Sequence, residues 1–181
     1  VRKVTLYYEL TNASYSYDRA NLLDKAFELR KQSLAQCIIA FGKEHQHYGT
    51  GVSLLGRYYE QQQNFEKALP LYQEALENTE NALGKEHFTY VISLNNLAGL
   101  YESMGQYQKA LPLYLEALEN TENSLGKDHS FYGTGLNNLA VLYESMGQYQ
   151  KALSLFLEAL ENTKNSLGKN HSSYGKSLNN L

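Results

Sequence analysis

The chain has 181 residues, of which 43% are hydrophobic and 19% are charged, and its formal net charge is −3 at pH 7. This composition allows a substantial buried core within the size of one ordinary domain. Acidic and basic residues are interspersed, so the sequence lacks the basic patches that bind nucleic acids or anionic membranes. A single cysteine, Cys37, excludes an internal disulfide. No apolar run approaches the roughly 20 residues that cross a bilayer.

The sequence repeats itself at a step of 42 residues. A Gly-Lys-x-His motif begins at Gly42, Gly84, Gly126 and Gly168, and the residues between these motifs also recur. A fixed period of this size is typical of a stack of supersecondary units, each of which contacts only its neighbours. Such a stack presents an extended surface, which favours binding over catalysis.

The first repeat, over residues 4–41, departs most from the others. Leu23 and Ala26 match their columns, but Arg30 stands where the later repeats have Tyr or Phe. The first helix also contains more Tyr and less Leu. This repeat is therefore either a capping unit, which arrays require, or a diverged internal one. The apolar stretch around Cys37 predicts a buried, unreactive thiol.

Each later repeat predicts two helices. In the third repeat Leu94, Leu97, Ala98 and Tyr101 have the i, i+3, i+4, i+7 spacing of one helix face, and Gly105 ends that helix. No segment alternates with period two, so no strands are expected. The predicted helix pairs span about 46–83, 88–125 and 130–167, with a truncated fifth unit at 172–181. We therefore expect one all-α array over residues 1–181, with the α-α superhelix as its fold class.

These residues resemble the tetratricopeptide repeat (TPR). Its signature W-x2-L-G-x2-Y…A-x3-F falls on Leu94, Leu97, Ala98, Tyr101, Ala110 and Tyr114. The 42-residue step and the LGK-x-H connector resemble the kinesin-light-chain subtype. The phrase SLNNLAGLYESMGQYQKALPLYLEALE is similar to bacterial arrays that precede CHAT-type protease domains. The resemblance implies a right-handed solenoid of antiparallel helix pairs, whose first helices line a concave groove that binds extended peptides.

Asparagines recur beside the apolar face of the first helices, where this groove would lie. Asparagine is a mediocre helix former, so its repeated use in mid-helix requires a reason. Its amide both donates and accepts hydrogen bonds, which suits an extended peptide backbone. The alternative is a hydrogen bond between neighbouring repeats. The resemblance favours the Asn96 column as the ligand-binding one. The candidates are Asn12, Asn95, Asn96, Asn137, Asn138, Asn179 and Asn180.

An acidic residue recurs in the last turn of each first helix, where the helix dipole disfavours negative charge. This column is Asp18, Glu60, Glu102 and Glu144. One interpretation is an ion pair within each helix pair, with the lysine column Lys25, Lys67, Lys109 and Lys151. The other is an acidic stripe that selects cationic ligands, which makes Glu102 and Glu144 groove candidates.

Kinesin light chains carry basic residues around the groove for acidic peptides. Only Arg19, Arg57 and Lys176 could serve in that way here, and Arg57 is therefore a further groove candidate.

Histidines directly precede the predicted first helices, at His45, His87, His129 and His171. Neighbouring repeats lie roughly 10 Å apart, and metal–nitrogen bonds are about 2 Å long. Histidines of adjacent repeats therefore cannot share an ion, and a capping and packing role is expected. No catalytic grouping stands out from the repeat background, and no metal or cofactor is expected.

We expect a protein–protein interaction scaffold rather than an enzyme. Its groove would bind an extended, neutral-to-basic peptide or partner segment, without nucleic acid or membrane, in the cytoplasm. One alternative is the regulatory arm of a larger enzyme such as a CHAT-type protease. Another is a self-assembling solenoid whose copies associate end to end.

Overall fold

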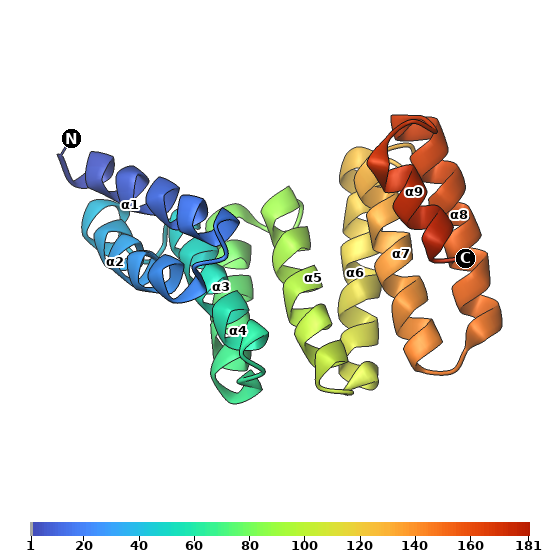
Figure 1. Cartoon of the computed structure of the whole chain (residues 1–181), viewed down its shortest axis with the longest axis horizontal. Coiled ribbons are helices and arrows are strands. Elements are labelled where there is room, and N and C mark those ends of the chain that lie inside the picture. Colours follow the sequence, from blue (N-terminus) through green and yellow to red (C-terminus); the bar gives the residue numbers. More distant parts are fainter. Residues whose placement is uncertain (1) are drawn as a thin grey trace. The chain divides into compact units, whose positions relative to one another are not determined.

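The computed structural model describes residues 2–181, and over that range it contains helices and no strands. The predicted all-α fold class is confirmed. The chain divides into two compact units, Val1–Gly84 and Lys85–Leu181 (Figure 1). The first unit contains α1 (Arg2–Arg19), α2 (Leu23–Phe41), α3 (Gln46–Gln61) and α4 (Phe65–Leu83). The second contains α5 (Phe88–Ser103), α6 (Tyr107–Leu125), α7 (Ser130–Ser145), α8 (Tyr149–Leu167) and α9 (Ser172–Asn179).

A tight turn joins the two helices of each repeat. Gly105 and Gly147 have φ angles of 69° and 71° in these turns, a left-handed conformation that favours glycine. The Gly105 N–H donates to the Glu102 carbonyl at 2.8 Å, and so the first helix stops where the sequence predicts. Asn21 and Gln63 take the left-handed conformation in the first unit.

Small residues lie where the two helices of a repeat cross. Ala98 of α5 and Ala110 and Ala117 of α6 are all at most 1% exposed. Because these side chains are short, the helices approach closely, and the larger Tyr114 packs against Leu139 of the next first helix. In the first unit Cys37 is fully buried, and burial raises the pKa of its thiol. The predicted buried cysteine is confirmed.

A second close approach joins the end of one repeat to the start of its first helix. Asn78 donates from Nδ2 to the Lys43 carbonyl at 2.6 Å, and its Oδ1 accepts from the Gly49 N–H at 2.9 Å. Asn162 likewise donates to the Lys127 carbonyl at 2.5 Å. A Cβ atom on Gly133 would lie only 2.3 Å from Asn162 Oδ1, so a larger residue at this position has to displace the Asn162 amide.

We predict that Gly133→Ala destabilises the second unit by roughly 1–3 kcal/mol, because the added methyl group displaces the Asn162 amide. Gly99→Ala is the matched control. A Cβ atom there meets its nearest neighbour, the Tyr114 hydroxyl, at an ordinary 3.5 Å, so alanine should stabilise α5 by up to about 1 kcal/mol. Urea unfolding followed by circular dichroism measures both changes. Equal effects of the two variants would contradict the close approach at Gly133.

Candidate functional site

Pockets lie between successive first helices within each unit. In the second unit, one pocket of about 160 Å³ lies between α5 and α7, and another of about 560 Å³ lies between α7 and α9. They use equivalent positions of the repeat. Asn95 and Asn138 line the first pocket, and Asn137 and Asn180 line the second. In the first unit a pocket of about 220 Å³ lies between α1 and α3, where Thr11 and Leu54 take these positions. We call these the α5–α7, α7–α9 and α1–α3 pockets.

The α5–α7 pocket has apolar walls. Phe88, Val91 and Ile92 of α5 face Phe131 of α7, and the rings of Phe88 and Phe131 have centroids 4.4 Å apart. Ile92 and Phe131 are 42% and 44% exposed, so solvent reaches this apolar surface. The asparagine amides supply the polar groups of the same pocket. An apolar side chain with a polar backbone fits such a lining.

The asparagines form hydrogen bonds between neighbouring first helices. Asn138 Nδ2 donates to Asn95 Oδ1 at 3.1 Å, and Asn180 Nδ2 donates to Asn137 Oδ1 at 3.4 Å. Asn95 itself donates to the Val91 carbonyl one turn back, at 2.8 Å. The inter-repeat hydrogen bond that the sequence left as an alternative is therefore present. Peptide binding by the same amides stays a prediction.

The other asparagine candidates differ in their surroundings. Asn96 lines the α5–α7 pocket and is half-buried. Asn12 on α1 and Asn179 at the end of α9 are exposed and lie outside the lining of these three pockets. Arg57 on α3 is 45% exposed and donates to Asp18 at 2.8 Å.

The acidic column pairs with partners that the sequence analysis did not identify. Asp18 accepts from Arg30 at 2.7 Å, Glu60 accepts from the Tyr72 hydroxyl at 2.7 Å, and Glu102 accepts from the Tyr114 hydroxyl at 2.9 Å. The interpretation as ion pairs with the lysine column is wrong. Those lysines lie instead over the rings of Tyr17, Tyr59, Tyr101 and Tyr143, at 5.1 to 5.8 Å from the ring centroids. There the ammonium stays hydrated and gains a cation–π contact.

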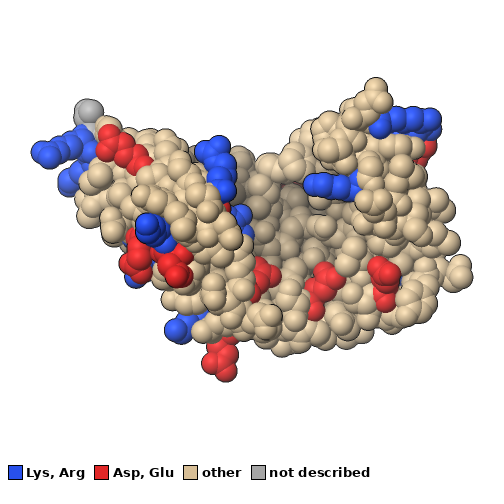
Figure 2. Space-filling view, in the orientation of Figure 1, with Lys and Arg blue, Asp and Glu red and all other residues tan. Residues whose placement is uncertain are grey.

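Glu102 and Glu144 differ in their surroundings, because only Glu102 accepts a hydrogen bond from a tyrosine. Burial raises the pKa of Glu102, and the hydrogen bond from Tyr114 opposes that shift. In the fourth repeat Phe156 replaces this tyrosine and has no hydroxyl to donate, and Glu144 is exposed. Figure 2 shows acidic side chains separated by uncharged surface rather than one continuous acidic area.

The recurring histidines cap the first helices, as predicted. His45, His87, His129 and His171 each accept at Nδ1 from the backbone N–H two residues later, at 3.1 to 3.2 Å. Each bond satisfies one free N–H at the start of a helix. Within residues 2–181 no three His, Cys, Asp or Glu side chains are grouped so that they could hold a metal ion. The described helices also include none with the length and apolar character to span a bilayer.

Two features of the site were missed from the sequence. A tyrosine near the start of α3, α5 and α7 donates to a glutamate 26 residues later, as Tyr48 does to Glu74 at 2.5 Å and Tyr90 does to Glu116 at 2.7 Å. Both columns recur, so their constant offset was a usable signal. Phe88 and Phe131 do not recur at a step of 42 residues and gave no such signal.

The comparisons with known proteins agree with this geometry. The tetratricopeptide repeat model matches residues 10–81, 49–123, 89–165 and 131–181. These matches span most of the chain, and so the chain belongs to the tetratricopeptide repeat family. No curated protein matches the sequence.

Solved structures share the fold at low sequence identity. BtubC (BKLC) from P. vanneervenii aligns with a TM-score of 0.79 and 24% identity, over 88% of this chain and 64% of BtubC. A Podosopora anserina protein described as a kinesin light chain with nearly identical TPR-like repeats aligns with a TM-score of 0.78 and 23% identity. That alignment covers 96% of this chain and 82% of the other. The apo form of RapI aligns with a TM-score of 0.76 and 18% identity, over 100% and 48%.

The predicted TPR solenoid, with a fold like that of kinesin-light-chain arrays, is thus confirmed. The link to a CHAT-type protease domain stays a prediction.

His47 provides a test of the packing around the α1–α3 pocket. Its ring stacks on Tyr7 at 5.2 Å, and burial, followed by the nearby His45, lowers its pKa below 6.5. The unfolded chain therefore takes up this proton at a higher pH than the folded chain does. This contribution to stability is present above about pH 6.5 and is lost as the pH falls.

We predict that the wild-type chain loses more stability than His47→Phe when the pH falls from about 7.5 to about 5.5. Phenylalanine occupies the equivalent position at Phe131, so the variant keeps an aromatic ring there. Urea unfolding at the two pH values gives the change in free energy of unfolding for each protein. Both proteins contain the other four histidines, so the difference between the two changes reports on His47. An equal loss in both proteins would show that His47 titrates in the same way when folded and unfolded.

Proposed function

We propose that this TPR array is a protein-interaction scaffold whose second unit binds an extended segment of a partner protein along α5, α7 and α9. The observation that carries the proposal is the recurrence of open pockets at equivalent repeat positions on successive first helices. A ligand that crosses this surface meets similar polar groups at each step, which is the arrangement that a repeating peptide backbone requires.

The α5–α7 pocket is proposed to hold an apolar side chain of that segment. Its aromatic and aliphatic walls are already partly exposed in the absence of a partner. Covering them removes apolar surface from water, and full burial of a leucine-sized side chain contributes about 1.5–3 kcal/mol. The apolar side chain is thus the source of affinity.

The asparagines are proposed to orient the peptide backbone. Asn138 uses one amide hydrogen for Asn95, and a side-chain amide has two hydrogens and two oxygen lone pairs. The hydrogen bond between the helices fixes the plane of the Asn138 amide, so its second hydrogen and its oxygen are held in one orientation. Asn138 can therefore keep its hydrogen bond to the neighbouring repeat and form another one to a ligand.

The proposed partner segment is neutral to basic. Glu102 already accepts from Tyr114, whereas Glu144 is exposed and the residue equivalent to Tyr114 in its repeat, Phe156, has no hydroxyl to donate. A preference for cationic residues therefore depends on Glu144. Lys176 lines the α7–α9 pocket and adds a positive charge there, which opposes the basic preference within that pocket.

The test uses short peptides of Ser and Thr with a central Leu, and the same peptides with a central Ala. The Leu peptides should bind on the order of tenfold more tightly in calorimetry. Phe131→Thr should remove most of that difference, because it deletes one aromatic wall of the pocket. The variant should fold, since Thr89 occupies the same position in the preceding repeat. The double variant Asn96→Ala/Asn138→Ala should weaken both sets equally. Asn123→Ala, an exposed position on α6, is the control.

Charge is tested with Leu peptides that carry flanking Lys or flanking Glu. The Lys peptides should bind more tightly, by a margin that shrinks as salt rises. Glu144→Gln should remove the margin, and Glu102→Gln should change it little. Equal affinity for the Leu and Ala peptides would contradict the groove proposal, and tighter binding of the Glu peptides would contradict only its charge preference.

Self-association is a second candidate function, favoured by exposed leucines at the end of the second unit. Leu153 and Leu157 of α8 are 45% and 51% exposed, and Leu178 of α9 is 47% exposed. Leu111 is equivalent to Leu153 in the preceding repeat, and it packs against the following repeat. We propose that a second copy covers this face at high concentration, and that Leu153→Ser weakens the association. A molar mass that stays monomeric in light scattering up to millimolar concentration would contradict this.

For the whole protein we propose a reducing, cytoplasmic setting, which suits a chain whose cysteine is buried and unpaired.

A further inference from the structure

The first repeat replaces three core residues with polar ones, and all three line the α1–α3 pocket. Ser14, Arg30 and Ser33 are 0%, 2% and 5% exposed. The third repeat has Ala98, Tyr114 and Ala117 at the same positions. A capping repeat needs polar residues on its outer surface. Here they gather in the interior around one cavity, so capping does not account for them.

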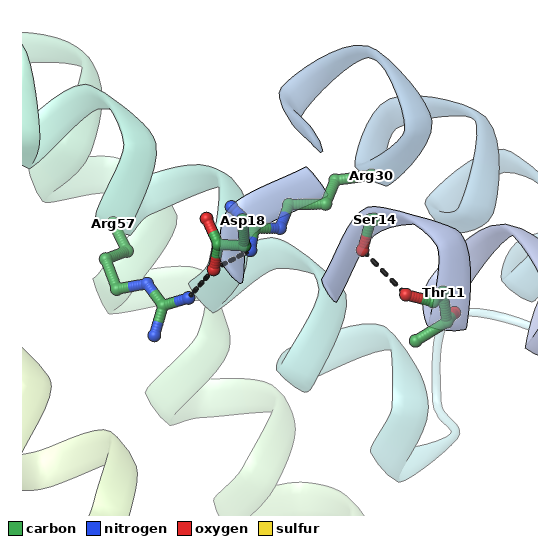
Figure 3. Close-up of polar contacts among 5 residues, drawn as sticks. All are labelled: Thr11, Ser14, Asp18, Arg30 and Arg57. Carbon is green, nitrogen blue, oxygen red and sulfur yellow. Dashed lines mark hydrogen bonds and ion pairs between the residues drawn. The ribbon is translucent and has the colours of Figure 1, made fainter. Parts of the chain in front are cut away.

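Arg30 is held by a charge but is not fully hydrogen-bonded. Its Nη2 donates to Asp18 Oδ2 at 2.7 Å, and Arg57 donates to the same oxygen at 2.8 Å. Figure 3 shows Asp18 of α1 between Arg30 of α2 and Arg57 of α3. The Nε of Arg30 is buried and has no acceptor among residues 2–181. Because Asp18 is shared by two guanidinium groups, the unmet requirement at Arg30 Nε is for an oxygen acceptor, and the charge of that acceptor is not fixed by Asp18 alone.

Three aliphatic hydroxyl groups that line the pocket, those of Thr11, Ser14 and Ser33, have their hydrogens engaged. Thr11 donates to the Tyr7 carbonyl at 2.8 Å, and Ser14 donates to the Thr11 carbonyl at 2.8 Å. The Thr11 and Ser33 hydroxyl oxygens lie 2.6 Å apart, and Ser33 Oγ is also placed to donate to the Tyr7 carbonyl at 3.5 Å, so both hydrogens are engaged whichever hydroxyl donates to the other. The three hydroxyl oxygens thus present lone pairs to the pocket, and a ligand has to donate to them.

From this inventory we propose that the α1–α3 pocket binds a primary carboxamide, the terminal group of a glutamine or asparagine side chain. Its oxygen accepts from Arg30 Nε, and its NH2 group donates to the hydroxyl oxygens. A carboxylate of the same shape supplies no donor for these hydroxyl oxygens, so the site discriminates against it. The amide is carried either by a free small molecule or by an extended polypeptide. The site belongs to the first unit and is independent of the groove proposed on the second.

The experiment compares two probes of equal shape, the N-acetyl N-methylamides of glutamine and glutamate. Both are titrated into the isotope-labelled full chain at neutral pH and followed by NMR. The glutamine probe should shift signals of α1–α3 and bind at least about tenfold more tightly than the glutamate probe. A second arm places Gln or Glu at the centre of a Ser/Thr peptide. Discrimination with the peptides alone assigns the amide to a polypeptide, and discrimination with both pairs assigns it to either source.

The variant Asp18→Glu/Arg30→Tyr removes the guanidinium and recreates the Tyr–Glu pair of the second and third repeats, which preserves the fold. It should abolish the discrimination between the probes. Lys31→Gln, a loss of one exposed charge on the same helix, should leave it unchanged. Glutamate binding as tightly as glutamine would overturn the proposal in favour of an anion site. The absence of binding in both arms would also overturn it, since the pocket would then hold only water.

Discussion

The close crossing of the two helices in each repeat is the constraint on which the rest of the structure depends. Small side chains such as Ala98 and Ala110 fix this crossing, and tyrosine–carboxylate hydrogen bonds hold the pair on either side of it. Because these residues recur in α5–α8, successive first helices of the second unit are presented to one another in the same way. The pockets between first helices therefore recur at equivalent positions, before any residue that contacts a ligand is considered.

The residues that vary on this constant framework decide what each pocket can hold. In the α5–α7 pocket Phe88 and Phe131 give apolar walls, whereas the α1–α3 pocket has Arg30 and hydroxyl groups. A repeat protein can in this way combine one architecture with several binding chemistries. The asparagines belong to both the framework and the pockets, since they join neighbouring helices in the second unit and also line its pockets.

Much of the fold was predictable from the sequence, because the apolar spacing around Leu94 and the turn at Gly105 are local signals. The caps at the recurring histidines followed from their position as well. The partner of Glu102 did not, because a recurring column fixes a position on a helix but not the direction in which a long side chain reaches. The pockets require residues from two repeats at once. Arg30 was visible as an exception, yet only the three-dimensional structure places Ser14 and Ser33 beside it.

We propose that pockets at equivalent positions of the repeat bind chemically different ligands. The most direct test of this proposal is an NMR titration of the labelled full chain with two ligands in turn, the glutamine probe and a Ser/Thr peptide with a central leucine. We expect two separate sets of shifted backbone amides, in α1–α3 for the glutamine probe and in α5–α9 for the leucine peptide. A single shared set of shifts, or shifts spread evenly over all repeats, would contradict the proposal.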